Sequence, residues 1–277
     1  MNIKPNVELS TTELDEILTL VRVIYGYDFT NYAQASLKRR ILRCMSLVNI
    51  QTVFALRFQL ANDAAFFAWF LQTIMVNVTE MFRDPPFYTN LREKVLPLLA
   101  SYPVIKIWHA GCSTGEEVYS MAILLKEANL LERCRIYATD LNAANLDKAR
   151  LGIIPLQTIH EYEVNYKEAG GKTDFSSYYT TEGDQAIINK NLRDSILFAQ
   201  HNLVTDRVFN EFQLVCCRNV LIYFNKDLQN HVIRLFHDSL ASLGYLAIGS
   251  KESLLFTDLQ SQFEPISAEN KIFRRTR

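Results

Sequence analysis

Apolar residues at helical spacing dominate the first part of the chain. In the stretch STTELDEILTLVRVIYG, they fall on one face of a helix, at Leu14, Ile17, Leu18 and Val21. Ser10 and Glu13 are placed to cap the start of this helix, and Gly26 is placed to end it. Similar patterns predict a helix that carries SLKRRILRCMSLV and helices at 51–61 and 63–75. The sequence therefore predicts an all-α N-terminal domain over residues 1–76.

The pattern changes around Asp84, because Pro85 and Pro86 are expected to break a helix and to mark a junction. Beyond this point strand-like and helical patterns alternate. Strands are expected at 104–108, 134–139, 212–216 and 243–249, and helices at 116–128, 142–150 and 226–241. Such alternation is typical of an α/β fold in which helical crossovers join parallel strands. We expect a linker over 77–90 that contributes residues to a ligand-binding site, followed by an α/β domain over 91–277.

Residues 155–200 interrupt this alternation. They contain the turn sequences GGK and EGD and short strand-like segments at 178–181, 186–188 and 196–199. The sequence therefore predicts a small antiparallel β-subdomain inserted at about 155–197.

The composition narrows the class of protein. The 277 residues are 49% hydrophobic, which suffices for a sizeable core, and the net charge of -1 gives no global field that would attract nucleic acid or a membrane surface. No apolar run is long enough to span a bilayer, and the first residues lack the pattern of a signal peptide. The five cysteines form no C-x-x-C pair, so neither a metal site nor a disulfide framework is expected. A reducing, cytoplasmic location and a monomer are the expectations.

Candidate chemistry lies at the ends of the predicted parallel strands, where such sheets bind ligands. The first strand leads into the small-residue loop AGCSTGEE, from Ala110 through Gly111 to the acids. Neither G-x-G-x-x-G nor a P-loop is present, since no Lys follows the second glycine. Asp140 ends the second strand, at a spacing suited to an acid that accepts the hydroxyls of a ribose. The third strand ends at Arg218 and Asn219, with Tyr223 close behind.

The acids that follow the loop indicate the charge of the ligand. Glu116 and Glu117 would repel a pyrophosphate but attract a nucleoside that carries a cation, and S-adenosylmethionine meets both requirements. Two alternatives stay open at this point. The two glutamates could be ordinary residues of a helix start, and Asp140 could be the N-cap of the helix at 142–150.

The stretch NVTEMFRDPPFY, residues 77–88, lies at the predicted domain junction. Its polar residues Asn77, Thr79, Glu80 and Arg83 are well placed to close over a ligand. Arg83 could bind the carboxylate of the cofactor or of a substrate through paired hydrogen bonds. The alternative for Arg83 is an interdomain salt bridge.

Five stretches together carry a resemblance to a known family. They are NVTEMFRDPPFY, WHAGCSTGEEVYSMAILL, YATDLNAANLDKARLGIIP, HNLVTDRVFNEFQLVCCRNVLIYFN and GYLAIGSKESL. Their order and spacing resemble those of the chemotaxis receptor methyltransferases of the CheR type, over roughly residues 10–275. The resemblance implies a class I methyltransferase fold behind an all-α domain. It also implies transfer of a methyl group from S-adenosylmethionine to glutamate side chains of chemoreceptor cytoplasmic domains, with S-adenosylhomocysteine as the product.

The resemblance assigns roles to individual residues. The implied cofactor-binding residues are Asn77, Thr79, Arg83, Ala110, Gly111, Glu116 or Glu117, Asp140, Asn202, Leu203, Arg218 and Asn219. On the substrate side it implies Arg92 and Tyr223, with Arg83 as a further residue that could orient the reacting carboxylate. The basic helix with Lys38, Arg39, Arg40 and Arg43 would face the receptor, unless it is only a solvated face. The inserted subdomain tethers the receptor in some members of the family.

The sequence departs from the family pattern at Met81, where phenylalanine is common, at His109, where many class I methyltransferases have an acid, and at Val118, where proline is frequent. None of these departures removes a group with an assigned role. A glutamate substrate is already ionised at neutral pH, so catalysis is expected to need positioning rather than a general base. Two other readings remain: a methyltransferase of the same fold that acts on another protein or on a small carboxylic acid, or a non-catalytic module that senses the cofactor.

Overall fold

The computed structural model describes residues 8–75, 79–255 and 257–276. The chain divides into two compact units. The first, here the helical unit, comprises residues 1–77 together with Ile222–Gln229, and the second, here the sheet unit, comprises Val78–Leu221 and Asn230–Arg277. The division falls next to the expected boundary at residue 76. The return of 222–229 to the helical unit was not foreseen from the sequence.

The helical unit contains α1 (Thr11–Tyr25), α2 (Gln34–Leu47), α3 (Val53–Asn62) and α4 (Ala64–Ile74). The capping signals act as expected at α1, where Ser10 and Glu13 form a capping box and Gly26 ends the helix at φ 76°. The predicted apolar face of α1 is buried. The all-α character expected for this part of the chain is therefore confirmed.

The sheet unit is built on a seven-stranded sheet in the order β6-β2-β1-β7-β8-β10-β9. The strands are β1 (Ile105–Ala110), β2 (Cys134–Asp140), β6 (Ile196–Gln200), β7 (Phe212–Cys217), β8 (Leu240–Ile248), β9 (Phe263–Ser267) and β10 (Ile272–Arg275). All neighbouring pairs from β6 to β8 are parallel, while β10 runs antiparallel to both β8 and β9. Since β2 and β7 flank β1, the chain order reverses at β1, which is where open α/β sheets bind ligands.

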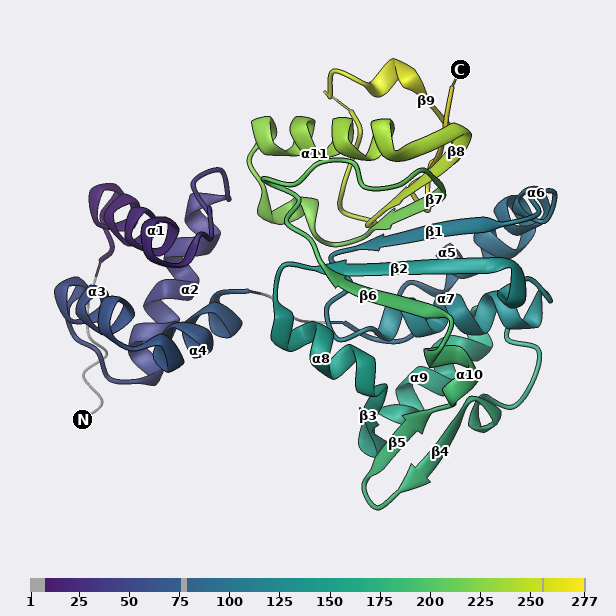
Figure 1. Ribbon diagram of the computed structural model, residues 1–277, viewed down its shortest axis with the longest axis horizontal. Coiled ribbons are helices and arrows are strands. Elements are labelled where there is room, and N and C mark those ends of the chain that lie inside the picture. Colours follow the sequence, from purple (N-terminus) through teal and green to yellow (C-terminus); the bar gives the residue numbers. More distant parts are fainter. Residues whose placement is uncertain (1–7, 76–78, 256, 277) are drawn as a thin grey trace. The chain divides into compact units, whose positions relative to one another are not determined.

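Helices cover both faces of this sheet, as Figure 1 shows for α11 (Lys226–Ser239) on one side and for α7 (Glu116–Glu127) and α8 (Ala143–Leu151) on the other. The core is apolar on both sides of the central strands, with Ile107, Ile136 and Leu214 fully buried. The α/β fold class expected from the sequence is confirmed. The hairpin of β9 and β10 was not predicted.

The insertion after α8 forms a second, three-stranded antiparallel sheet in the order β3-β5-β4. It consists of β3 (Ile153–Pro155), α9 (Leu156–Glu168), β4 (Tyr179–Glu182) and β5 (Gln185–Ile188), followed by the short helix α10 (Lys190–Arg193). One expected member does not belong to it. The segment expected at 196–199 is β6, which pairs in parallel with β2 at the edge of the main sheet. A short half-buried strand has the same residue pattern in either sheet, so the sequence could not identify its partner.

The prolines at the domain junction start a helix instead of breaking one. Helix α5 (Pro85–Asn90) has Pro85 and Pro86 in its first turn, where the missing N–H has no intrahelical partner to lose. A π-helix (Leu91–Val95) and α6 (Leu96–Leu99) continue it.

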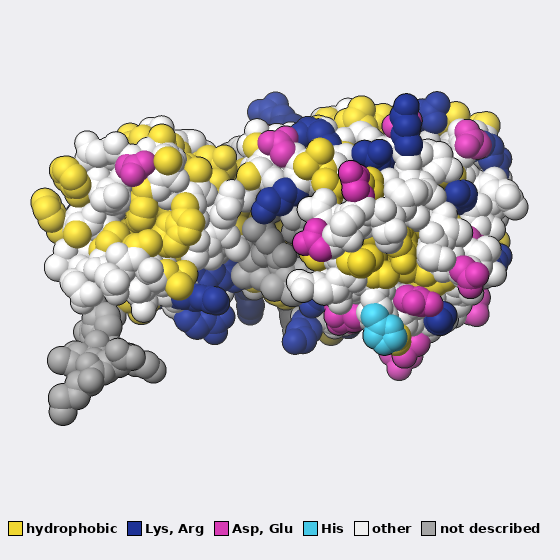
Figure 2. All heavy atoms as spheres, turned by 90° about the horizontal axis from the view of Figure 1, so that it is seen from below, with side chains coloured by type: hydrophobic (Ala, Val, Ile, Leu, Met, Phe, Trp, Pro, Cys, Tyr) yellow, Lys and Arg dark blue, Asp and Glu magenta, His cyan; other side chains and the backbone are white. Residues whose placement is uncertain are grey.

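The surface and the cysteines complete the description. Phe54 and Phe58, four residues apart on α3, are 78% and 61% exposed, and Figure 2 shows apolar side chains in yellow on the visible face of the helical unit. All five cysteines are buried free thiols. Within the ranges 8–75, 79–255 and 257–276, no helix combines the length and apolar character needed to cross a membrane.

Candidate functional site

Four adjacent strands of the sheet unit end at one edge of the sheet. The register pairs Ala110 at the end of β1 with Thr139 of β2, and Asp140 at the end of β2 with Gln200 of β6. β7 ends beside β1, since His109 pairs with Cys216. The structure therefore brings together the predicted residues that follow these strands, namely Ala110, Gly111, Asp140, Asn202, Leu203, Arg218 and Asn219.

The loop after β1 is held tightly against β2. The N–H groups of Gly111 and Cys112 both donate to the carbonyl oxygen of Thr139, at 2.8 and 2.9 Å. Gly111 has φ +77°, and a Cβ at this position would lie 2.5 Å from Cγ2 of Val220. Glycine is needed here for both its conformation and its lack of a side chain. The loop is thus a fixed segment of small residues next to Asp140, which a ligand can approach closely.

Asp140 accepts hydrogen bonds from the N–H groups of Ser113 and Asn142, at 2.9 and 2.8 Å. Burial raises the pKa of Asp140, although these N–H groups oppose the shift. Asn142 is the N-cap of α8, since its side chain accepts from the N–H of Ala144 at 3.0 Å. The alternative that Asp140 is the cap is therefore wrong. Two buried polar atoms of its immediate partners, Ser113 Oγ and Asn142 Nδ2, lack a hydrogen-bond partner within the described structure and fit a polar ligand here.

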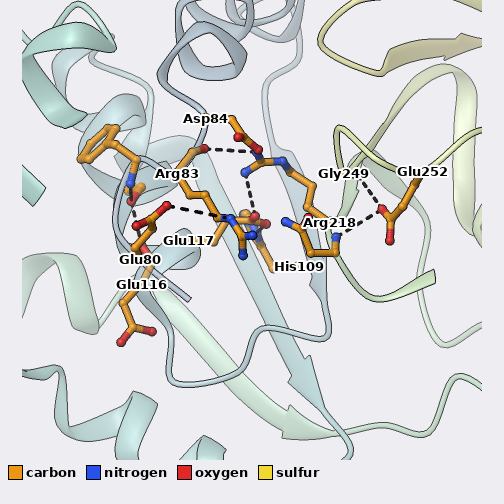
Figure 3. Close-up of polar contacts among 12 residues, drawn as sticks. Glu80, Arg83, Asp84, His109, Glu116, Glu117, Arg218, Gly249 and Glu252 are labelled. Atoms are coloured by element: carbon orange, nitrogen blue, oxygen red, sulfur yellow. Dashed lines mark hydrogen bonds and ion pairs between the residues drawn. The ribbon is translucent and has the colours of Figure 1, made fainter. Parts of the chain in front are cut away.

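Glu117 is neutralised by the protein itself. Its carboxylate contacts Nδ1 of His109 at 2.9 Å and Nη1 of Arg218 at 3.0 Å (Figure 3). Arg218 reaches on to Oδ2 of Asp84 at 2.7 Å, with its guanidinium 4.0 Å from the ring centre of Phe87. Burial alone would raise the pKa of Glu117, but the hydrogen bond with His109 and the charge of Arg218 outweigh it and lower the pKa. Arg218 therefore ties both the segment at Asp84 and the start of α7 to the end of β7.

Glu116 differs from its neighbour because it forms no ion pair with any residue that the structure describes. Its carboxylate accepts from Oγ1 of Thr114 at 2.7 Å, and Thr79 also bonds to it. Burial raises the pKa of Glu116, against the effect of these hydrogen bonds. Both acids lie in the first turn of α7, but of the two only Glu117 has an ion pair among the described residues.

Arg83 lies on a strained stretch of backbone that follows Thr79. Its neighbours Phe82 and Asp84 have φ of 54° and 58°, a conformation that costs energy for residues other than glycine. The N–H of Phe82 donates to Oγ of Ser120 on α7 at 2.9 Å, which fixes the stretch against the helix. Nε of Arg83 lies 3.9 Å from Oε1 of Glu80, a partner in the same unit. Asn77, the other cofactor residue predicted in this stretch, lies outside the described residues.

With this geometry established, the comparisons with known proteins decide the family. Residues 77–272 match the description "CheR methyltransferase, SAM binding domain", and residues 12–75 match "CheR methyltransferase, all-alpha domain". The chain belongs to the CheR methyltransferase family. S-Adenosylmethionine is accordingly its cofactor, and the doubly wound sheet is the class I methyltransferase fold.

Individual relatives agree with this membership. A Pseudomonas putida protein named as a candidate methyltransferase, Cher3, is 52% identical over 94% of this chain and 97% of its own length. A Listeria innocua protein named chemotaxis protein methyltransferase is 34% identical over 83% of this chain and 86% of its own. Among solved structures, the glycopeptide N-methyltransferase MtfA with S-adenosyl-L-methionine covers 58% of this chain and 53% of its own, at 11% identity and a TM-score of 0.35.

Arg92, predicted on the substrate side of the CheR-type site, is not brought to these strand ends. Its guanidinium pairs with Glu127 at 2.5 Å, and its Nε donates to the carbonyl of Ala169 at 3.0 Å. Glu127 is the last residue of α7, whereas the site lies at the first turn of that helix. Twelve residues of helix separate the two ends by about 16 Å. The geometry gives Arg92 a role in joining α7 to the insertion.

Tyr223 and the basic residues of α2 belong to the helical unit. The Arg40 guanidinium lies 4.6 Å from the ring centre of Tyr223 and donates to the carbonyl of Ile74 at 2.7 Å. Lys38 donates to Oγ1 of Thr11 at 3.1 Å, while Arg39 and Arg43 are exposed. The predicted basic surface is therefore reduced to Arg39, Arg43 and part of Lys38.

Glu252 is a residue of this site that the sequence analysis missed. Its buried carboxylate accepts from the N–H groups of Asn219 at 3.2 Å and of Gly249 at 2.5 Å, so it links the end of β7 to the end of β8. Asn219 itself has φ +61°. The only signal in the sequence was the position of this acid shortly after the predicted strand at 243–249. Acids at such positions are also common on protein surfaces.

Proposed function

We propose that this chain methylates glutamate side chains of chemoreceptor cytoplasmic domains and forms glutamate methyl esters. Support comes from the family and from relatives named as chemotaxis protein methyltransferases. The observation that carries the proposal is the division of labour between the two acids of α7. Glu117 is paired with Arg218, while Glu116, which has no ion pair among the described residues, is the acid that would face a cationic nucleoside.

The reaction asks little acid–base chemistry of the protein. The glutamate substrate has a pKa of about 4.3 in free form and is ionised at neutral pH. The cofactor supplies a methyl group on a sulfonium, which leaves as a neutral thioether. What the protein contributes is orientation of the attacking oxygen, in line with the methyl carbon and sulfur, and exclusion of water. Burial raises the pKa of the Cys112 thiol in the loop well above its usual value, so this thiol stays neutral and does not compete as a nucleophile.

Within this proposal each polar residue has a task. Asp140 binds the ribose hydroxyls beside the loop at Gly111, and Asn202 with Leu203 flanks the adenine. Thr79 and Arg83 hold the methionine part, with Arg83 on its carboxylate. Asn219 lines the far wall, and Arg218 supports the site through Glu117 and Asp84. Tyr223 keeps a role on the substrate side, as the family motif implies.

The proposal extends to partner and location. The exposed Arg39 and Arg43 of α2 offer positive charge to an acidic receptor surface, where electrostatic attraction speeds association. The enzyme acts as a cytoplasmic monomer on receptors at the membrane.

Incubation with methyl-labelled S-adenosylmethionine and receptor-containing membranes tests the proposal. We expect base-labile label on a receptor band, and much less of it with the variant Asp140→Asn. Label on other proteins or on small acids would replace the receptor with another substrate. If the protein bound the cofactor but transferred the methyl group to no component, it would be a cofactor-sensing module and not an enzyme.

A further inference from the structure

Helix α9 of the insertion contacts the stretch that carries Arg83. Nδ2 of Asn165 donates to the carbonyl oxygen of Met81 at 3.2 Å. Glu161 precedes Asn165 by four residues and therefore lies on the same face of α9. The carboxyl of Glu161 lies near enough to that of Glu80 to raise its pKa. The insertion thus contributes an acid to the wall next to Arg83.

Glu80 stands between a cation and a second acid. On one side its Oε1 lies 3.9 Å from Nε of Arg83, and on the other it meets Glu161 (Figure 3 shows the pair with Arg83). Burial raises the pKa of Glu80, and Glu161 and Asp84 raise it further against the effect of Arg83. Two carboxyl groups held side by side favour a cation between or beside them, because it relieves their repulsion.

The amino-acid part of the cofactor matches this pattern of charges. It carries an ammonium and a carboxylate on a single carbon atom, and Arg83 with Glu80 presents the opposite charges side by side. The inference rests on the proposed function, which assigns the carboxylate to Arg83. We propose that Glu80, backed by Glu161, binds the α-ammonium of the cofactor, so that the inserted subdomain takes part in cofactor binding.

Two probes isolate this contact by calorimetry on the full chain. S-Adenosylhomocysteine carries the amino-acid head, whereas 5′-methylthioadenosine shares the adenosine and the thioether but lacks that head. Glu80→Gln and Glu161→Gln should each lower the affinity for S-adenosylhomocysteine by about three- to tenfold, because each removes a negative charge near the ammonium. The affinity for 5′-methylthioadenosine should stay unchanged.

Glu163→Gln is the matched control, because Glu163 lies on the same helix and pairs with the exposed Lys167 at 2.7 Å. It should change neither affinity. Unchanged binding of S-adenosylhomocysteine in Glu80→Gln and Glu161→Gln would overturn the inference, and so would equal weakening of both probes. If only Glu80→Gln lowered the affinity for S-adenosylhomocysteine, the part of the inference that concerns Glu161 would be wrong. Glu161 is exposed, so its variant tests the contact even where Glu80→Gln disturbs folding. If the unaltered protein bound neither probe, the cofactor site itself would fail, an outcome distinct from all of these.

Discussion

The guanidinium of Arg218 lies 3.0 Å from the carboxylate of Glu117, and both side chains are largely withdrawn from solvent, with 2% and 19% exposed. The two residues come from different elements, since Arg218 follows β7 and Glu117 belongs to the first turn of α7. Asp84 binds the same guanidinium at 2.7 Å. One buried cation thus joins three segments that surround the cofactor site.

Glu117→Gln should destabilise the sheet unit by about 3 kcal/mol, because it leaves a buried guanidinium with half of its compensation. The lowered pKa of Glu117 fixes the sign of the pH dependence. A carboxylate with a depressed pKa in the folded state stabilises above its unfolded pKa of about 4.3, and this contribution is lost as the pH falls toward the folded pKa. Thermal unfolding should therefore show a lower Tm for the variant at pH 7 and a smaller difference below pH 4. A difference of the same size at both pH values would contradict this.

Asp140→Asn should cost both cofactor affinity and stability. The ribose would lose a charged acceptor, which lowers the affinity for S-adenosylhomocysteine by about 30-fold. Stability should fall as well, because the two carboxylate oxygens accept from the N–H groups of Ser113 and Asn142, and the single amide oxygen of the variant can accept from only one of them. Calorimetry and a thermal scan at pH 7 should show weak binding together with a lower Tm. Full affinity would rule out the ribose assignment.

Gly111→Ala should lower both Tm and cofactor affinity, because its Cβ would meet Val220 at 2.5 Å on a residue with φ +77°. Gly183→Ala is the matched control, since Gly183 has φ +60° and no atom within 4 Å of the added Cβ. The control should cost only about 1 to 2 kcal/mol of backbone strain. Adding Val220→Ala to Gly111→Ala should restore part of the loss. Equal effects of the two glycine variants would show that conformation alone, and not the contact, matters.

The four central strands of the main sheet, β2, β1, β7 and β8, could be predicted because each is a short apolar run next to a helical pattern. Local signals such as Ser10 with Glu13 were also sufficient for the start of α1. The sequence did not show which strand pairs with which. The strand at 196–200 is a half-buried edge strand, and its pairing with β2 is settled by the packing of the whole domain. The prolines at 85 and 86 were ambiguous, since proline both ends one helix and opens the next.

The cofactor side of the site followed from one topological rule, that ligands lie beyond the ends of parallel strands. This rule placed Asp140 and the loop at Gly111 correctly at one edge of the sheet. It gave no information about partners far away in sequence, such as Arg218 with Glu117, 101 positions apart. The family motif likewise suggested Arg92, but a motif position does not give a distance, and the π-helix at 91–95 directs this side chain to Glu127.

The basic helix α2 yields a last prediction, because the structure separates its arginines. Arg39 and Arg43 are exposed, whereas Arg40 is half-buried and binds the carbonyl of Ile74 and the ring of Tyr223. Reversing both exposed charges, in Arg39→Glu with Arg43→Glu, should raise the KM for receptor about tenfold at low salt, with cofactor affinity unchanged. Arg40→Ala should instead lower Tm, since it removes a contact that holds the end of α4.

Receptor methylation assays at two salt concentrations check this separation. The effect of the double reversal should shrink at high salt, as the attraction between exposed charges is screened. If the double reversal left the KM unchanged at low salt, the exposed arginines would be only a solvated face, and receptor recognition would have to depend on another surface.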